Sequence, residues 1–289
     1  MYCTFYGFRE SPFTITPNPR FLFMSAQHRE AFAHLTYAVE SRAGFIELTG
    51  EVGTGKTTLL RTFLSRLDSE GHRTALIFNP CLSSLELLTS INREFGLLWE
   101  NGSRMELLQA LNGFLLEQKA AGRSVVLVMD EAQNLSPEVL EQIRLISNLE
   151  TETDKLIQIV LSGQPELLSI LARAELRQLN QRITVRYHLL PMGFDSTRRY
   201  IEHRMELAGR FRAAEFSNAA LKRIFRYSGG VPRLVNIACD RVLLIGFTED
   251  DRLISGRMAA QAISELRGRA PYGIGARFFA RIFRHLPRW

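Results

Sequence analysis

A glycine-rich segment at residues 50–57 carries the residue types that bind nucleotide phosphates. Gly50, Gly55, Lys56 and Thr57 fit the pattern G-x-x-x-x-G-K-[ST]. Glycines let the backbone curl so that successive N–H groups point at phosphate oxygens, and the following helix presents its positive end. Lys56 then bridges the β- and γ-phosphates, while the Thr57 hydroxyl coordinates Mg²⁺. We therefore predict ATP and Mg²⁺ as cofactors, with ATP held by Gly50, Glu51, Val52, Gly53, Thr54, Gly55, Lys56, Thr57 and Thr58.

Two acidic residues follow a strongly apolar run and predict the catalytic side of this site. Asp130 and Glu131 come directly after the run at 124–129. Ligands collect at the carboxyl ends of parallel strands, so this pair is expected beside the phosphate loop. We expect Asp130 to hold Mg²⁺ through water and Glu131 to polarise the attacking water as general base. The alternative, that both acids only cap the next element, loses weight beside Lys56 and Thr57.

A second polar segment, Ser-Gly-Gln-Pro at 162–165, follows another apolar run. Its short polar side chains can sense a γ-phosphate or the attacking water, with Gln164 as the first candidate and Ser162 as the second. The structural alternative is a strand-to-helix turn in which Gly163 and Pro165 serve the backbone alone.

Three arginines are candidates for contacting transferred phosphate. Arg177 and Arg182 flank the start of the last apolar run, and Arg233 follows Gly-Gly-Val-Pro at 229–232. A guanidinium against a transferring phosphoryl group raises the rate by orders of magnitude and is often supplied by a neighbouring subunit. A single arginine is more often solvated or paired at the surface, so spacing alone does not assign these roles.

The elements that must position these residues alternate between two kinds. Near-continuous apolar runs separated by helical segments indicate a parallel sheet covered on both faces. The predicted strands are 45–49, 74–79, 124–129, 156–161 and 183–190. A helix is predicted before them at 26–42, and only helices after Gly193, at 195–210, 217–228, 232–247 and 256–266. Prolines at 12, 17 and 19 disfavour regular structure in residues 1–25.

The composition limits the class of protein. The chain has 289 residues, 46% of them hydrophobic, and a net charge of +6. No acidic residue follows Glu265, where six arginines lie, so the rest of the chain balances 30 basic against 30 acidic residues. This neutral body does not support a surface that coats DNA. No signal peptide and no apolar run of ~20 residues is visible, and the three cysteines lie far apart, so we expect a cytoplasmic protein.

Taken together, these segments resemble the AAA+ ATPases. More narrowly they resemble the ExeA/GspA-type secretion ATPases, a family with relatives in pilus and exopolysaccharide or exosortase loci. The resemblance covers roughly residues 1–265. Its segments are YGFxxxPF at 6–13, PNPRF at 17–21, GEVGTGKTT at 50–58, DEAQ at 130–133, SGQPEL at 162–167, LRQLxQRI at 176–183 and PRLVN at 232–236.

The resemblance implies an α/β fold, a P-loop NTPase three-layer sandwich with a parallel five-stranded sheet, followed by a small all-α lid domain. The expected organisation is an N-terminal extension with the first helix at 1–43, the ATPase core at 44–192, the lid at 193–266 and a basic aromatic tail at 267–289. It also implies that Arg182, alternatively Arg177, acts in trans as the arginine finger. Gln164 or Ser162 would be sensor 1 and Arg233 sensor 2, touching ATP. A finger in trans requires a homo-oligomeric ring or filament.

The expected function is that of an ATPase that assembles or energises an envelope machine for secretion, polysaccharide export or pilus formation. Components of that machine would be its partners. The alternative is a DNA-binding AAA+ ATPase of the transposition-regulator or initiator type, which the arginine-rich composition keeps open. A nucleotide switch with little turnover is disfavoured by the presence of Glu131.

The tail adds an expectation of its own. Residues 270–289 place an apolar stripe beside arginines at helical spacing, a composition that suits peripheral contact with an anionic inner membrane. The alternatives are docking on the protein's own body and a frayed end.

Overall fold

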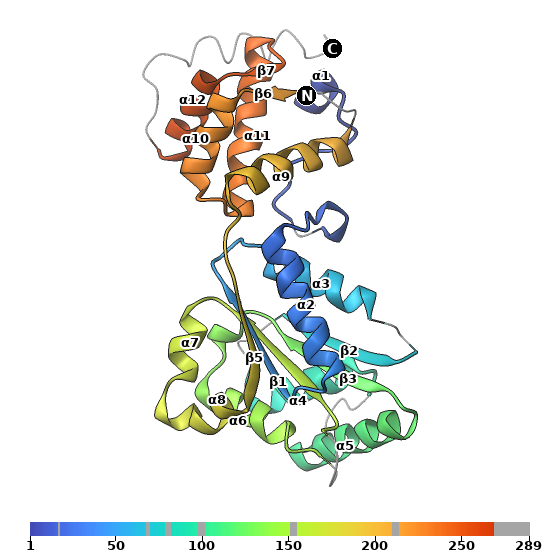
Figure 1. Ribbon diagram of the computed structural model, residues 1–289. Helices are drawn as coiled ribbons and strands as arrows, with labels where there is room; N and C mark the ends of the chain where they lie inside the picture. The colour runs from blue at the N-terminus through green and yellow to red at the C-terminus, as the bar shows by residue number, and fades with distance from the viewer. Residues whose placement is uncertain are drawn as a thin grey trace. The chain divides into compact units, whose positions relative to one another are not determined.

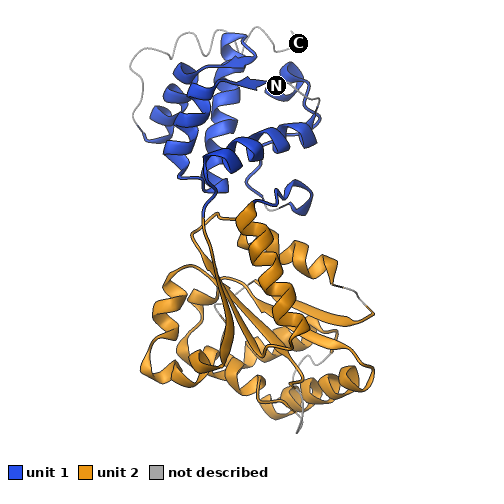
Figure 2. Cartoon of the chain, in the orientation of Figure 1, with its two compact units in different colours: residues 1–25, 191–289 blue, residues 26–190 orange. Residues whose placement is uncertain are grey.

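The computed structural model describes residues 1–16, 18–67, 70–78, 82–97, 102–150, 155–209 and 214–268 (Figure 1). They form two compact units (Figure 2). One unit comprises residues 26–190. The other combines residues 1–25 with the chain from Pro191 onward. The predicted segment 1–43 is thus divided, because its first part packs with the helices that follow the sheet. The tail at 270–289, for which membrane contact is expected, lies outside the described residues.

The first unit is built on a parallel five-stranded sheet, which confirms the predicted fold class. The strand order is β2-β3-β4-β1-β5. The strands are β1 (Phe45–Gly50), β2 (His72–Ile77), β3 (Ser124–Met129), β4 (Gln158–Gly163) and β5 (Ile183–Leu189). The three central strands are almost entirely buried, as their near-continuous apolar sequences require, whereas the edge strand β5 alternates between buried and more exposed positions.

Two strands are shifted by two residues relative to their apolar runs, β2 toward the N-terminus and β4 toward the C-terminus. The runs 74–79 and 156–161 predict strands that the structure places at 72–77 and 158–163. Pairing with the neighbouring strand decides these ends: His72 pairs with Ser124 at the start of β3, and Gln158 pairs with Val126. Ladder register depends on residues far away in the sequence, so local hydropathy does not fix it.

Helices cover both faces of this sheet (Figure 1). Ala75, Leu127 and Ile159 point from the sheet into one large core, while the alternate residues Val126 and Val128 are buried on the other face. Helix α2 packs on β1 and β5, α3 on β1, α4 on β2 and α5 on β3. The helical segments of this unit are α2 (Ala26–Glu40), α3 (Lys56–Arg66), α4 (Ser84–Glu94), α5 (Arg104–Ala120), η2 (Ala132–Asn134), α6 (Pro137–Ile146), α7 (Glu166–Leu171), η3 (Ala174–Leu176) and α8 (Arg177–Arg182).

The second unit is mainly helical. It contains α1 (Tyr2–Tyr6), η1 (Pro19–Phe21), α9 (Phe194–Ala208), α10 (Asn218–Ser228), α11 (Pro232–Glu249), α12 (Gly256–Leu266) and the short strands β6 (Glu215–Phe216) and β7 (Leu253–Ile254). Two expectations are wrong here. The segment 1–25 does hold helical turns: α1 ends before the first proline, and η1 begins at Pro19, a helix position that proline fits. The region after Gly193 is not purely helical, because β6 pairs with β7.

Buried aromatic side chains and one arginine attach the N-terminal segment to the helices of its unit. Tyr6, Phe8 and Phe13 belong to the same core as α9, α10, α11 and α12. The guanidinium of Arg204 on α9 donates to the carbonyl oxygens of Pro12 and Thr14. Residues 1–25 therefore complete this core rather than extend the sheet.

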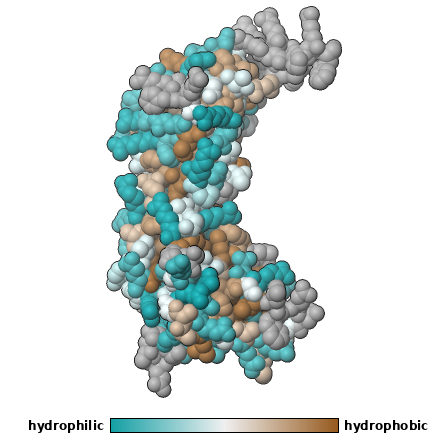
Figure 3. Space-filling model, turned by 90° about the vertical axis from the view of Figure 1, so that its right-hand side faces the viewer, coloured by the Kyte–Doolittle hydropathy of each residue, from teal (hydrophilic) through white to brown (hydrophobic). Residues whose placement is uncertain are grey.

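Neither the drawn surface nor the described helices have the apolar character of a membrane-spanning segment. Figure 3 shows apolar residues scattered among hydrophilic ones on the face that it draws, and single exposed apolar side chains of this kind are ordinary. Among the described residues, no helix combines the length and the apolar character needed to span a membrane.

Candidate active site

The glycine-rich loop runs from the end of β1 to the start of α3. Gly53 and Gly55 have φ angles of 80° and 100°, in the left-handed region. A Cβ on Gly50 would lie 2.7 Å from the carbonyl oxygen of Leu189 on β5. Only glycine fits this close approach, because that contact is with rigid backbone. The loop therefore keeps its curled shape, in which N–H groups lead into the N-terminus of α3.

Lys56 is the first residue of α3 and lies almost buried, with 5% of its surface exposed. Its ammonium Nζ donates to the carbonyl oxygens of Gly50 at 2.6 Å and Glu51 at 3.2 Å. Burial lowers the pKa of Lys56, and the nearby carboxylates of Glu131 and Asp130 oppose that shift. Its Nζ donors therefore face the backbone carbonyl oxygens of the loop.

Asp130 joins three elements through one carboxylate. Oδ2 accepts a hydrogen bond from the Thr57 hydroxyl on α3 at 2.6 Å. Oδ1 accepts from the Ser162 hydroxyl at the end of β4 at 2.8 Å and from the backbone N–H of Glu131 at 3.0 Å. Asp130 is 2% exposed, so these donors replace the water that its charge loses.

The strand register explains why these residues meet. Met129 at the end of β3 pairs with Leu161 on β4, and the next residues are Asp130 and Ser162. Strand β1, which leads into the loop and Thr57, lies on the other side of β4. The meeting point is the carboxyl edge of the sheet, as expected for this fold.

Glu131 is held by two glutamines. Its Oε2 accepts from Gln133 Nε2 at 2.7 Å and from Gln164 Nε2 at 3.2 Å. The Gln133 Oε1 atom in turn accepts the backbone N–H of Gln164 at 3.0 Å. Glu131 itself has φ 55°, a left-handed conformation that is uncommon for a residue with a side chain. The surrounding hydrogen bonds fix this carboxylate in one orientation.

The residues present fit a nucleotide with Mg²⁺. Mg²⁺ prefers oxygen ligands, and the Thr57 hydroxyl and an Asp130 carboxylate oxygen lie 2.6 Å apart at the start of α3. Lys56 and the loop N–H groups supply positive charge for phosphates next to this pair. A donor set of this kind is suited to phosphoryl transfer.

The structure brings most of the expected residues together, and it separates two of the arginines from this site. Ile183 of β5 pairs with Phe45 at the start of β1, whereas Gly50 pairs with Leu189 at the end. Helix α8, which carries Arg177 and Arg182, precedes Ile183 and so lies at the end of the sheet opposite to the phosphate loop of this chain.

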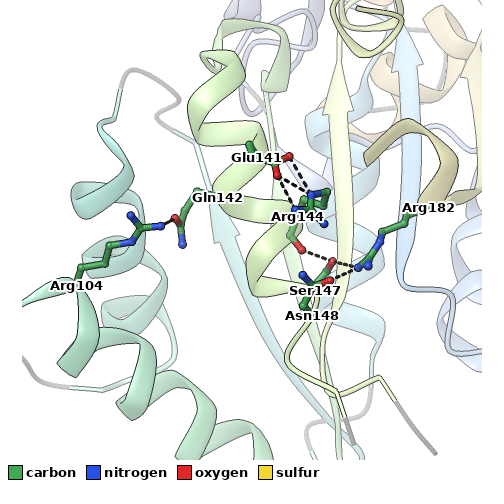
Figure 4. Close-up of polar contacts among 7 residues, drawn as sticks. All are labelled: Arg104, Glu141, Gln142, Arg144, Ser147, Asn148 and Arg182. Carbon is green, nitrogen blue, oxygen red and sulfur yellow. Dashed lines mark hydrogen bonds and ion pairs between the residues drawn. The ribbon is translucent and has the colours of Figure 1, made fainter. Parts of the chain in front are cut away.

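The two arginines of α8 differ in their contacts. Figure 4 shows Arg182 donating to Ser147 Oγ and to Asn148 Oδ1 at the C-terminal end of α6. The Ser147 hydroxyl, in turn, donates to the carbonyl oxygen of Arg144. The side chain of Arg177 is exposed and forms no hydrogen bond or ion pair with another described residue. Arg233 belongs to the other compact unit, where it is exposed in the first turn of α11.

A buried histidine that no sequence pattern marks lies behind the loop. His28 on α2 is 4% exposed, and its Nε2 lies 3.1 Å from the carbonyl oxygen of Thr54. A Cβ on Gly55 would come within 3.0 Å of the same Nε2 atom. Burial lowers the pKa of His28, so the neutral ring with Nε2–H as donor is favoured. Helical periodicity marks α2 but gives no sign that one of its residues supports the loop 26 positions later.

Known proteins with similar sequences include an AAA domain family and a secretion protein. A family model described as an AAA domain matches residues 39–171. The chain is 44% identical over 279 residues to General secretion pathway protein A of Aeromonas hydrophila, an alignment that covers 95% of this chain and 51% of that protein. The chain therefore spans about half the length of this relative.

Solved structures show the same fold at low identity. Cdc6p from Pyrobaculum aerophilum superposes with a TM-score of 0.66 at 19% identity, over 99% of this chain and 74% of that one. The ORC2 protein of Aeropyrum pernix, solved in ADPNP–ADP complexes, gives 0.61 at 19% identity, over 82% and 66%. RuvB of Thermotoga maritima gives 0.53 at 18% identity, over 83% and 68%.

The contact between His28 and the loop yields a test. Replacing His28 with Ala removes a donor to Thr54 and leaves space behind Gly55, so the loop becomes less ordered. Loss of one such hydrogen bond costs about 1 kcal/mol, and we expect a roughly fivefold weaker affinity for a fluorescent ADP analogue.

The matched control is His34→Ala on the same helix, whose ring packs on Tyr187 rather than on the loop. The control is expected to stay within about twofold of the unmodified chain. Equal affinities of the two variants would show that His28 does not support the loop. Thermal unfolding of both variants separates loop effects from loss of the fold.

Proposed function

We propose that this chain, an AAA+ protein of the General secretion pathway protein A type, binds ATP with Mg²⁺ and hydrolyses it to ADP and phosphate. The observation that carries the proposal is the linked pair of carboxylates after β3. Asp130 is joined to Thr57 at the start of α3, and Glu131 is oriented by Gln133 and Gln164. Asp130 therefore faces the Thr57 hydroxyl, which would bind the metal, while Glu131 remains available as a base.

The roles of the residues follow from their positions. The loop N–H groups and Lys56 would bind the phosphate oxygens, and Thr57 with Asp130 would hold Mg²⁺, which neutralises charge on those oxygens. Glu131 would take a proton from water as the water oxygen bonds to the γ-phosphorus and the bond to the ADP oxygen breaks. The proton ends on the Glu131 carboxylate, and the products are ADP and phosphate.

Gln164 and Ser162 would act on different carboxylates. Gln164 contacts Glu131, the proposed base, whereas Ser162 contacts Asp130, the proposed metal-side acid. This difference supports Gln164 as the residue that senses the reacting end of the nucleotide, with Ser162 fixing Asp130.

An arginine of α8 would complete the site of a neighbouring copy. Both arginines precede β5 at the sheet end away from this chain's own loop, so neither serves that loop. The exposed, unpartnered side chain of Arg177 favours it as the finger, while Arg182 holds α8 against the end of α6. The assembly required is a ring or filament of identical chains. Arg233 would contact ATP from the helical unit as sensor 2.

We further propose that the hydrolysis serves an envelope secretion or export machine on the cytoplasmic side of the inner membrane. The support is the identity to General secretion pathway protein A along 95% of this chain. The likeness to Cdc6p and ORC2 concerns the fold alone, and together with the neutral charge of residues 1–265 it gives DNA binding no separate support.

The role of Glu131 is tested by Glu131→Gln. The amide keeps the shape but cannot accept the proton, so phosphate release should fall at least about 100-fold while ATP binding stays intact. Lys56→Ala should instead weaken ATP binding. Glu138→Gln, on the first turn of α6, removes an exposed acid and serves as control. Hydrolysis at the unmodified rate in Glu131→Gln would exclude this residue as the base.

The finger in trans is tested by mixing variants. Arg177→Ala should lose at least about 100-fold in phosphate release without a change in melting temperature, because its side chain has no described partner. Adding inactive Lys56→Ala chains should restore part of the activity, since each supplies an intact Arg177 to a neighbour. Arg182→Ala, in contrast, should lower the melting temperature, because it removes the hydrogen bonds of Arg182 to Ser147 and Asn148. Full activity of Arg177→Ala, or no rescue at any mixing ratio, would contradict the assignment.

A further inference from the structure

The helical unit carries a small hollow between α10 and α12 that the proposed ATPase site does not use. Its volume is ≈ 330 Å³. The lining residues are Arg223, Arg226, Tyr227, Ala260, Ile263, Ser264 and Arg267. Three cations thus surround one hollow.

The positive charge of this hollow is not neutralised within the described part of the chain. Arg223 and Arg226 are exposed, and neither side chain forms a hydrogen bond or an ion pair with another described residue. Arg267 lies over the ring of Tyr227, with its guanidinium carbon 5.8 Å from the ring centre. Three like charges in one place repel, so an anionic occupant would be favoured there.

Glu249 on α11 and Glu265 on α12 are already paired with arginines of this unit. Glu249 at the end of α11 pairs with Arg257 at 2.5 Å. Glu265 on α12 accepts from Arg241 Nε at 2.6 Å and from Gln261. No residue that lines the hollow carries a carboxylate, so an acidic segment of a partner would meet positive charge that is not neutralised there.

The apolar part of the lining indicates which kind of acidic molecule would fit the hollow. Ala260, Ile263 and Tyr227 line it together with the arginines. An apolar centre with Arg and Tyr at its edge is typical of protein–protein interfaces, where these residues contribute most of the binding energy. Duplex DNA is bound through about six to ten phosphate contacts in a row, more than three arginines around one hollow provide.

From these observations we infer that the hollow between α10 and α12 is a docking site for an acidic segment of a partner protein. An apolar side chain of that segment enters the hollow onto Ile263. Flanking carboxylates pair with Arg223, Arg226 and Arg267, for which planar guanidinium groups are well suited. The inference concerns a surface separate from the phosphate loop and does not rest on ATP hydrolysis.

The experiment uses the full chain and a fluorescein-labelled peptide built of Glu-Glu-Leu repeats, with fluorescence anisotropy as the measurement. The triple variant R223Q/R226Q/R267Q should raise the dissociation constant at least about tenfold. The control R9Q/R198Q/R199Q removes the same charge from exposed arginines elsewhere in this unit and should change it less than about twofold. A second peptide with Ser in place of Leu should bind more weakly, since it makes no apolar contact with Ile263 and Ala260 of the lining.

Three results would overturn the inference. Equal binding of the peptide to both triple variants would show that these arginines do not form the site. Equal binding of the Leu and Ser peptides would show that only net charge matters. A short DNA duplex that binds more tightly than the peptide, and loses its affinity in R223Q/R226Q/R267Q, would identify a nucleic-acid site instead. Circular dichroism of both variants confirms that the fold is kept.

Discussion

The buried carboxylate of Asp130 is the interaction on which the site depends. A charge at this depth is stable only because three donors surround it, from α3, from β4 and from its own following backbone. These donors come from three separate segments of the chain, so the carboxylate fixes their mutual positions. The start of α3, and with it the phosphate loop, is thereby tied to the carboxyl edge of the sheet.

The hydrogen bonds of Asp130 also give the two adjacent acids, Asp130 and Glu131, different partners. Asp130 accepts the N–H of Glu131 and so orients the next peptide, where the chain turns with a left-handed residue. Glu131 then points to Gln133 and Gln164 rather than to Thr57. Neighbouring carboxylates with different partners are suited to different tasks, one beside a metal and one as a base. The hydrogen bonds, more than the sequence adjacency, create this division.

Much of this arrangement was predictable because it depends on local sequence. The loop at 50–57 and the apolar strands before Asp130 and Ser162 carry their own signals, and the parallel sheet follows from them. Gly50 is conspicuous in the sequence. The need for glycine at this position comes from the carbonyl oxygen of Leu189, which only the fold brings near. His28 behind the loop and the packing of residues 1–25 on the helices likewise depend on distant partners. The contrast between Arg177 and Arg182 also required the structure, because both have the same sequence context.

The central claim is that Asp130 and Thr57 form the metal side of the site. Titration calorimetry of ATP binding with and without Mg²⁺, on the unmodified chain and on Asp130→Asn, tests it most directly. Asn keeps one oxygen for Ser162, but it is neutral and replaces the other carboxylate oxygen, which would face Mg²⁺ and its water, by an NH₂ donor. The account predicts that Mg²⁺ strengthens ATP binding in the unmodified chain and not in Asp130→Asn, whose metal-free affinity is kept by Lys56 and the loop. An Mg²⁺ effect of equal size in both proteins would contradict it.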